Sequence, residues 1–215
     1  MVYATTTPGA GMTKGTSCFL VPRETKGFSV ARCNETLGGR FMNNGEMVFE
    51  DMEVPEEHLL VKDVALARAG VYFRPGKIIQ GSKNLGVAVR AYEETVKYVH
   101  DYVQGGKKLA EHQGLQWMLA DMSVQRDAAR GLTYRAIEAL MRGERGTMEA
   151  SAAKLFATEA LGKVADAAVQ IHGGAGYMQE YAVERLYRDV RLFRIFEGTT
   201  QIQQLVIARH MLREA

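Results

Sequence analysis

The hydrophobic residues of this 215-residue chain change their spacing at about residue 63, and this change constrains the fold more than any other feature. Before it, short apolar runs lie at 18–21, 27–32 and 46–51. Glycine, proline and asparagine separate these runs, which predicts short antiparallel strands joined by turns. About four strands are too few for an independent β-sandwich. We therefore interpret residues 1–62 as a truncated part of a β domain.

After residue 63 the apolar residues recur every three or four positions, which is the spacing of one buried helix face. Stretches of this kind, three long and two short, cover residues 85–99, 115–140, 152–171, 183–189 and 200–212. The connection at 143–146 is short, so the helices on either side are expected to pack antiparallel. The predicted fold is mainly α: an up-down helical bundle at residues 63–215, preceded by a partial antiparallel β domain.

Charge and composition argue against several classes of partner. The chain has 27 basic and 25 acidic side chains, and a net charge of +2 gives no reason to expect nucleic acid or an anionic membrane as a partner. No apolar run reaches the roughly 18–20 residues needed to cross a bilayer. Cys18 and Cys33 lack the spacing of a metal site or a disulfide scaffold, so no metal is predicted. We expect a cytoplasmic protein without membrane insertion.

The segment 193–201 is the first of two candidate functional segments. It places Glu197 after aromatic and aliphatic residues and directly before Gly198. Apolar surroundings disfavour the charged form of a carboxylate, which is how enzymes keep a general base effective near neutral pH. The alternative is that Glu197 merely precedes the last helix, whose start is predicted at the capping-box pair Thr200 and Gln203. Local chemistry alone favours this alternative.

The second candidate segment is the glycine-rich run 172–177, which begins with His172. Closely spaced glycines allow the backbone to approach a ligand, and exposed N–H groups can bind phosphate oxygens. The alternative is a helix C-cap followed by a tight turn, with His172 as an ordinary histidine near a helix end. Local chemistry alone again favours the alternative.

Taken in order along the chain, these segments resemble the acyl-CoA dehydrogenase family. The motifs in the first part are G-F-S-V at 27–30, L-G-G-R at 37–40, V-F-E-D-M-E-V-P at 48–55 and E-H-Q at 111–113. The final third is the most specific, with Q-I-H-G-G-A-G-Y at 170–177, V-E-R-L-Y-R-D at 183–189, E-G-T-T-Q-I-Q at 197–203 and I-A-R at 207–209. Several ordered motifs outweigh the structural alternative that each motif favours alone.

The resemblance implies FAD-dependent α,β-dehydrogenation of an acyl-CoA thioester. Members of the family bind FAD between a β domain and a C-terminal four-helix bundle, and a glutamate removes the α-proton while the β-hydrogen leaves as hydride to the flavin. By its place in the motif, Glu197 is the implied catalytic base. The implied FAD contacts are Gln113, Gln170, Ile171, His172, Gly173, Gly174, Thr199 and Gln201. The implied acyl-CoA contacts are Gly198, Arg209 and Arg74, although Lys77 lies near the position that Arg74 resembles.

Two departures from the family pattern leave further hypotheses open. The family's N-terminal helical domain and first β strands are absent, and Tyr102 stands where the family usually carries an arginine near the FAD diphosphate. The chain is therefore expected to be the C-terminal half or one subunit of the enzyme, in a homo- or hetero-oligomer with a chain that supplies the N-terminal half. An electron-transferring flavoprotein is the implied acceptor. The alternatives are a non-catalytic scaffold subunit or degenerate paralogue, and a flavin monooxygenase, against which Glu197 counts.

Overall fold

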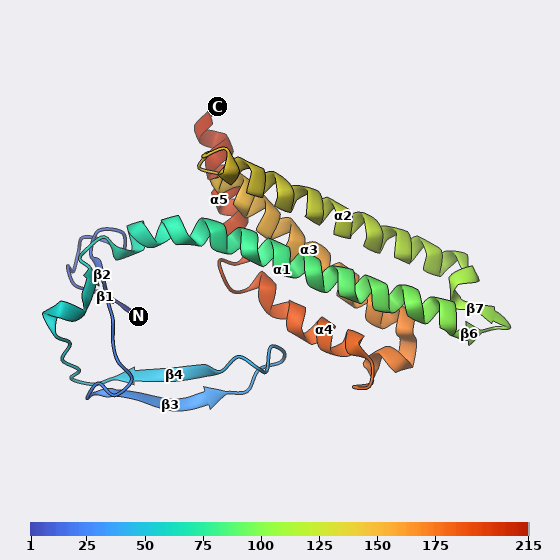
Figure 1. The fold of residues 1–215 in the computed structure, drawn as a ribbon, viewed down its shortest axis with the longest axis horizontal. Coiled ribbons are helices and arrows are strands. Elements are labelled where there is room, and N and C mark those ends of the chain that lie inside the picture. Colours follow the sequence, from blue (N-terminus) through green and yellow to red (C-terminus); the bar gives the residue numbers. More distant parts are fainter. Residues whose placement is uncertain (215) are drawn as a thin grey trace. The chain divides into compact units, whose positions relative to one another are not determined.

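Long helices dominate the structure of the chain, a computed structural model that describes residues 1–214 (Figure 1). The strands are β1 (Val2–Thr5), β2 (Thr16–Phe19), β3 (Phe28–Asn34), β4 (Asn44–Phe49), β5 (Leu59–Val61), β6 (Val103–Gln104) and β7 (Lys107–Lys108). The helices are α1 (Ala65–Asp101), α2 (Gln113–Met141), α3 (Thr147–His172), α4 (Ala182–Val190) and α5 (Thr200–Glu214). Short 3₁₀ helices are η1 (Glu56–His58), η2 (Leu109–Glu111), η3 (Gly173–Tyr177) and η4 (Arg191–Arg194). This order confirms the predicted fold class.

The chain divides into two compact units, neither of which is one continuous stretch. The strand unit consists of Met1–Thr36 and Arg40–Phe73, and the helical unit consists of Leu37–Gly39 and the chain from Arg74 onward. The division after Phe73 falls beside Pro75 in α1. Proline lacks an N–H group, so the helix loses one backbone hydrogen bond there. The division into two domains at residue 62 stays a prediction.

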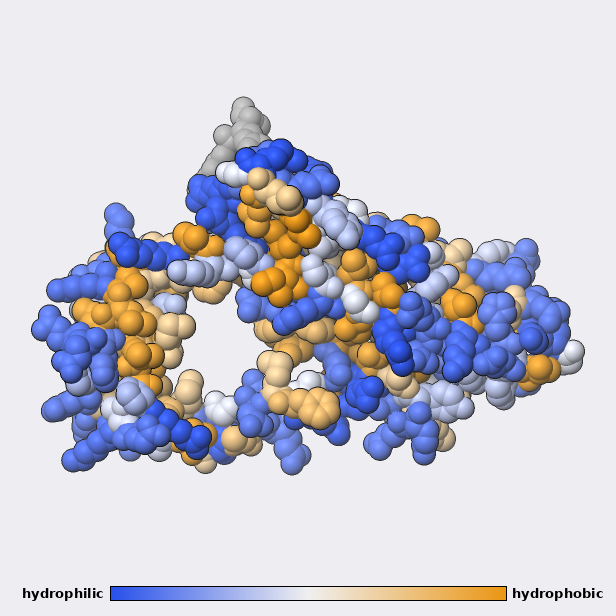
Figure 2. All heavy atoms as spheres, in the orientation of Figure 1, coloured by the Kyte–Doolittle hydropathy of each residue, from blue (hydrophilic) through white to orange (hydrophobic). Residues whose placement is uncertain are grey.

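The strand unit contains two small antiparallel sheets. In one sheet β2 lies between β1 and β5, and in the other β3 pairs with β4. Figure 2 shows hydrophobic atoms at the surface over β1 and β2. The exposed apolar side chains of this unit include Leu20, Val30, Phe41, Met42, Met47 and Leu60. Exposed apolar surface on short strands is typical of a region that other chain segments cover.

The helix α3 is the centre of the helical unit and packs against α2, α4 and α5. Its core face is made largely of small side chains, and the buried alanines are Ala150, Ala153, Ala157, Ala160, Ala165 and Ala168. Small side chains at the contact allow neighbouring helices to approach closely. The connection between α2 and α3 is short, and the two helices pack along each other as the sequence predicts.

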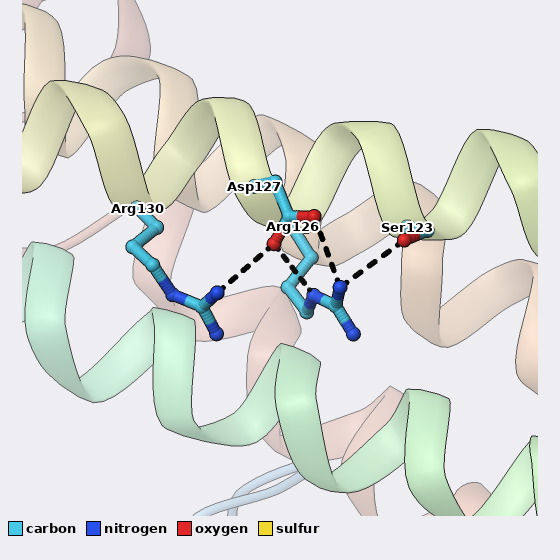
Figure 3. Close-up of polar contacts among 4 residues, drawn as sticks. All are labelled: Ser123, Arg126, Asp127 and Arg130. Atoms are coloured by element: carbon cyan, nitrogen blue, oxygen red, sulfur yellow. Dashed lines mark hydrogen bonds and ion pairs between the residues drawn. The ribbon is translucent and has the colours of Figure 1, made fainter.

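A polar cluster on α2 is built around Arg126 (Figure 3). Arg126 donates to both carboxylate oxygens of Asp127 at 2.9 and 3.0 Å and to Ser123 Oγ at 3.1 Å. Arg130 donates to the same carboxylate at 3.1 Å. The guanidinium of Arg126 also lies 4.7 Å from the ring centre of Tyr92 on α1, which is a cation–π contact. The hydrogen bond from Arg126 lowers the pKa of Asp127, so this carboxylate stays charged.

The segment Leu37–Gly39 belongs to the helical unit because it binds α4. The Gly39 N–H donates to the Asp189 carboxylate at 2.7 Å, and Arg188 Nη1 donates to the carbonyl oxygen of Leu37 at 3.0 Å. A Cβ atom on Gly38 would stand 2.5 Å from the carbonyl carbon and oxygen of Arg188. No side chain fits at that distance, so this close approach requires glycine.

The helix α1 is longer than the stretch 85–99 that the apolar spacing predicts, because it already begins at Ala65. Its first part contains Pro75 and three glycines, which local propensity reads as helix breakers. Packing in the folded chain overrides that propensity. Among residues 1–214, no helix is long and apolar enough to cross a membrane.

Candidate functional site

The turn 195–199 carries Glu197 and connects η4 to α5. Glu197 has a φ of 55° and Gly198 a φ of 87°. A left-handed backbone costs a non-glycine residue about 1–2 kcal/mol, so neighbouring groups must hold Glu197 in this conformation. Phe193 and Phe196 pack on each other with 5.5 Å between ring centres. The Glu197 side chain is exposed in this chain, whereas the sequence pattern predicts apolar surroundings.

Two completely buried side chains hold this turn from within the bundle. Lys154 of α3 donates from Nζ to the carbonyl oxygen of Gly198 at 2.7 Å. Gln203 of α5 donates from Nε2 to the carbonyl oxygens of Gly198 at 2.9 Å and of Glu197 at 3.2 Å. A Cβ atom on Gly198 would stand 2.5 Å from Gln203 Nε2. Position 198 therefore requires glycine both for its backbone angle and for its contacts.

The start of α5 is capped differently from the sequence prediction. Thr199 Oγ1 accepts a hydrogen bond from the Ile202 N–H at 3.3 Å, which is the pattern of a helix N-cap. The Thr200 hydroxyl instead donates to Glu159 Oε1 on α3 at 2.6 Å. The predicted capping box of Thr200 and Gln203 is therefore wrong, because both side chains form hydrogen bonds outside the first turn of α5.

The helix α1 contributes Gly76 and Lys77 on another side of the turn. A Cβ atom on Gly76 would lie 3.7 Å from Glu197 Oε2, so the carboxylate stands beside the α1 backbone. Lys77 donates from Nζ to Ser151 Oγ on α3 at 3.0 Å, and burial lowers the pKa of Lys77. Arg74 instead donates to a backbone carbonyl in the connection between α2 and α3 at 3.0 Å. Of these two cations, Lys77 thus contacts the same part of α3 as the Glu197 turn.

The other residues implied for FAD lie at the opposite end of α3. They are Gln113, Gln170, Ile171, His172, Gly173 and Gly174. Lys154 and Gln170 are 170 − 154 = 16 residues apart in this helix, which at 1.5 Å per residue is about 24 Å. One copy of the chain therefore does not bring this group next to Glu197, Thr199 and Gln201.

His172 belongs to an aromatic cluster at that end. Its ring stacks on Tyr98 with 4.1 Å between ring centres, and its Nδ1 lies 2.7 Å from the carbonyl oxygen of Ala168. The residue is 5% exposed, and burial lowers the pKa of its imidazole. Tyr102 stacks on Tyr98 at 5.2 Å, and both line a pocket of about 330 Å³ together with Tyr181. Aromatic surface thus occupies the place where the family resemblance implies an arginine.

The groups at this end fit the polar part of a flavin nucleotide. Gly173 has a φ of 59° and nothing within 4 Å of the Cβ it would carry, so its backbone is open to a ligand. Gln113 and Gln170 are exposed, and their amide groups can donate to phosphate oxygens. The charged lining of the neighbouring pocket is Lys97 with two carboxylates. These charges sum to −1 and do not favour an anion. The hydrogen-bonding groups therefore fit the polar part of a flavin nucleotide, whereas the charge of the neighbouring pocket does not.

The sequence pattern does not predict Lys154 or Gln203 as site residues. For Lys154 a signal is nevertheless present, because it lies on the small-residue face of α3, four positions after Ala150 and three before Ala157. A lysine on a core face is rare unless it is paired. Arg209 lies on α5, and its side chain is exposed.

Known proteins match the chain along nearly its whole length. The family model described as "Acyl-CoA dehydrogenase, C-terminal domain" matches residues 67–212. An acyl-CoA dehydrogenase of Bacillus subtilis is 41% identical over 217 residues, covering 99% of this chain and 56% of that protein. A caffeyl-CoA reductase-Etf complex subunit of Acetobacterium woodii is 37% identical, covering 100% of this chain and 56% of that protein.

The fold also matches a solved enzyme structure. Butyryl-CoA dehydrogenase from Megasphaera elsdenii is similar with a TM-score of 0.92 and 33% sequence identity, covering 98% of this chain and 55% of that chain. The chain spans about half the length of the curated relatives it matches.

Proposed function

The chain belongs to the acyl-CoA dehydrogenase family, and we propose that it supplies the base-bearing C-terminal part of an enzyme that dehydrogenates an acyl-CoA thioester. The observation that carries this proposal is the backbone of Glu197, which has a φ of 55°. Two buried donors, Lys154 and Gln203, hold the turn in this conformation. A glutamate that only preceded a helix would need no such support, whereas strained backbone held by its surroundings is common at active sites.

In the proposed reaction Glu197 is the general base. Its carboxylate accepts the α-proton of the thioester, and the β-hydrogen leaves as a hydride while a C=C bond forms between the two carbons. FAD, when bound, supplies the acceptor for that hydride. The α-proton is weakly acidic, so the base acts best when water is excluded from it. Because Glu197 is exposed in this chain, we propose that the substrate and the rest of the enzyme cover it.

We place the acyl-CoA on the side of the turn that faces α1. Gly198 has no side chain, so its backbone can approach the thioester closely. Arg209 on α5 and Arg74 on α1 are the proposed cations for the anionic CoA part. Lys77 is a further candidate on α1, because it lies next to Gly76, which faces the Glu197 carboxylate.

We propose that FAD contacts come from two copies of the chain. Thr199 and Gln201 lie beside the base, whereas Gln170 and Gly173 lie at the other end of α3. Gln170 is about 24 Å along that helix from Lys154, which contacts the Glu197 turn. Because the two groups of residues lie at opposite ends of α3, one FAD would contact one group from each of two neighbouring subunits. The proposed state is therefore a homo- or hetero-oligomer, completed by a chain that supplies the N-terminal half. A lone copy should bind FAD weakly.

An electron-transferring flavoprotein is the proposed redox partner. One relative is named as a subunit of a reductase-Etf complex, which supports such a partner for this chain. The same relative suggests a second candidate function, reduction of an unsaturated acyl-CoA. In that direction a protonated Glu197 would return its proton to the α-carbon, since each step of a reversible reaction uses the same groups both ways. Both candidates assign the same role to Glu197.

Replacing Glu197 by glutamine tests the proposed base. Glutamine is nearly isosteric but cannot accept a proton at useful pH, and losing a general base typically slows a reaction about 10²–10⁴-fold. The protein is purified from its own cells with the chains that accompany it, loaded with FAD, and mixed anaerobically with acyl-CoA substrates while flavin bleaching is followed. Glu138→Gln, an exposed glutamate on α2, is the matched control and should bleach like the parent.

Two outcomes would contradict the proposal. If Glu197→Gln bleaches as fast as the parent, Glu197 is not the base. If the parent itself is not bleached by any saturated acyl-CoA, and its reduced flavin is not oxidised by any unsaturated acyl-CoA, the scaffold-subunit alternative is correct.

A further inference from the structure

Lys154 is the side chain that the fold alone does not explain. It is 0% exposed and lies on the alanine face of α3. Methionine would fill the same space at that position without bringing a charge into the core. Replacing a buried charge by an apolar side chain of similar size is often neutral or stabilising. A buried lysine at such a position therefore points to a role other than stability.

The contact that Lys154 makes is with the backbone of the proposed active site. Its Nζ lies 2.7 Å from the carbonyl oxygen of Gly198. Gly198 directly follows Glu197 in the chain, so a donor on the Gly198 carbonyl constrains the backbone on the C-terminal side of Glu197. Gln203 Nε2 donates to the same carbonyl at 2.9 Å. The two donors occupy both lone pairs of this carbonyl oxygen, and Glu197, the residue before it, has a strained backbone with a φ of 55°.

The charges near Lys154 also concern the Glu197 turn. Burial is the main cause that lowers the pKa of Lys154, and the neighbouring Lys77 lowers it further. The carboxylates of Glu159 and Glu197 act in the opposite direction. Lys154 thus lies within electrostatic reach of the Glu197 carboxylate while it donates to the backbone of the next residue.

We propose that Lys154 is a positioning residue for Glu197: by holding the Gly198 carbonyl it keeps Glu197 in the left-handed conformation that puts the carboxylate beside Gly76 of α1. This inference rests on the proposed function in one respect, because it takes Glu197 as the base. Lys154 itself touches neither the substrate nor the flavin. Its effect reaches the reaction only through the backbone of the turn.

The test compares Lys154→Met with the parent in the FAD-loaded complex. Losing a charge-assisted hydrogen bond that orients the base should slow flavin bleaching at saturating acyl-CoA about 10- to 100-fold. The acyl-CoA concentration for half-maximal rate should change less than about 3-fold, since Lys154 does not bind the substrate. Thermal stability and flavin content should be equal to or higher than those of the parent. Lys163→Met, an exposed lysine on the same helix, is the control and should change none of these values.

An unchanged bleaching rate in Lys154→Met would overturn the inference. A loss of rate that merely follows a loss of stability and flavin content would also overturn it, because that is the result of a structural role. If Lys154→Met does not fold, Lys154→Gln, which keeps a donor but no charge, replaces it with the same expected direction.

A second measurement separates this inference from the proposed function. The crystal structure of the Lys154→Met chain should show Glu197 out of the positive-φ region. If the parent complex is inactive toward every acyl-CoA, the proposed function fails, but the backbone of Glu197 still decides the role of Lys154. A Glu197 that keeps its φ near 55° without Lys154 would refute the inference whatever the activity is.

Discussion

Replacing Gly198 by alanine should destabilise the helical unit, and the cost can be worked from the geometry of the turn. The φ of 87° at this position is unfavourable for alanine, at about 1–2 kcal/mol. The new Cβ would stand 2.5 Å from Gln203 Nε2, so the amide must move away from both carbonyls that it binds. Two hydrogen bonds at about 0.5–1.5 kcal/mol each add about 1–3 kcal/mol. The expected loss is therefore about 2–5 kcal/mol.

Urea unfolding followed by far-ultraviolet circular dichroism measures this loss. Gly86→Ala is the matched control, because Gly86 lies inside α1 and nothing stands within 4 Å of the Cβ it would carry. Glycine in a helix interior is about 0.5–1 kcal/mol less stable than alanine. The same substitution should therefore shift the unfolding midpoint down at position 198 and up at position 86.

A Gly198→Ala variant as stable as the parent would refute the reasoning. It would mean that the turn relaxes to a negative φ without losing the bonds to Gln203, and that neither Gln203 nor the backbone angle fixes Glu197. In that case flavin bleaching should also be unaffected. A variant with the stability of the parent but slower flavin bleaching would also refute the predicted loss of stability, and would show that the turn serves the reaction and not the fold.

Two further predictions concern the aromatic cluster. Burial lowers the pKa of His172 below 6.5 in the folded state, so the unfolded state takes up the proton first as the pH falls. The free energy of unfolding should be complete above about pH 6.5 and decrease below it, more steeply in the parent than in His172→Phe. Equal slopes of the two proteins in urea titrations at several pH values would contradict this. Tyr102→Arg should raise FAD affinity roughly 10- to 100-fold by adding a charge-assisted contact, and calorimetry showing no gain would contradict it.

The helices are the part of the fold that the sequence predicts best, because their apolar spacing follows directly from burial of one face. The stretches 115–140 and 152–171 correspond closely to α2 and α3. The strands β1 and β5 are not predicted, since each is short and only partly buried and depends on pairing with β2. Strand pairing between distant segments leaves little local signal.

The candidate site likewise has a part that the sequence predicts and a part that depends on contacts between distant segments. The motif around Glu197 can be read in the sequence, and so can the helix that starts at Thr200. The predicted capping box of Thr200 and Gln203 fails because the Thr200 hydroxyl binds Glu159, 41 residues away. The backbone angle of Glu197 cannot be read there, since it depends on Lys154, 44 residues before Gly198. The sequence shows which residue types the site contains. Contacts between segments about 40 residues apart decide which of these residues act together.

The attachment of Leu37–Gly39 to α4 has a consequence for how such a protein can be recombined. The family match begins at residue 67, yet the helical unit takes three residues from a position well before it. A gene exchange with a single crossover near residue 67 would therefore combine the helices of one parent with the segment 37–39 of the other parent. The recombined protein would keep this contact only if one parent supplies glycine at position 38 and the other supplies an acceptor such as Asp189. Recombination across this boundary is thus restricted by a short peptide far from the crossover point.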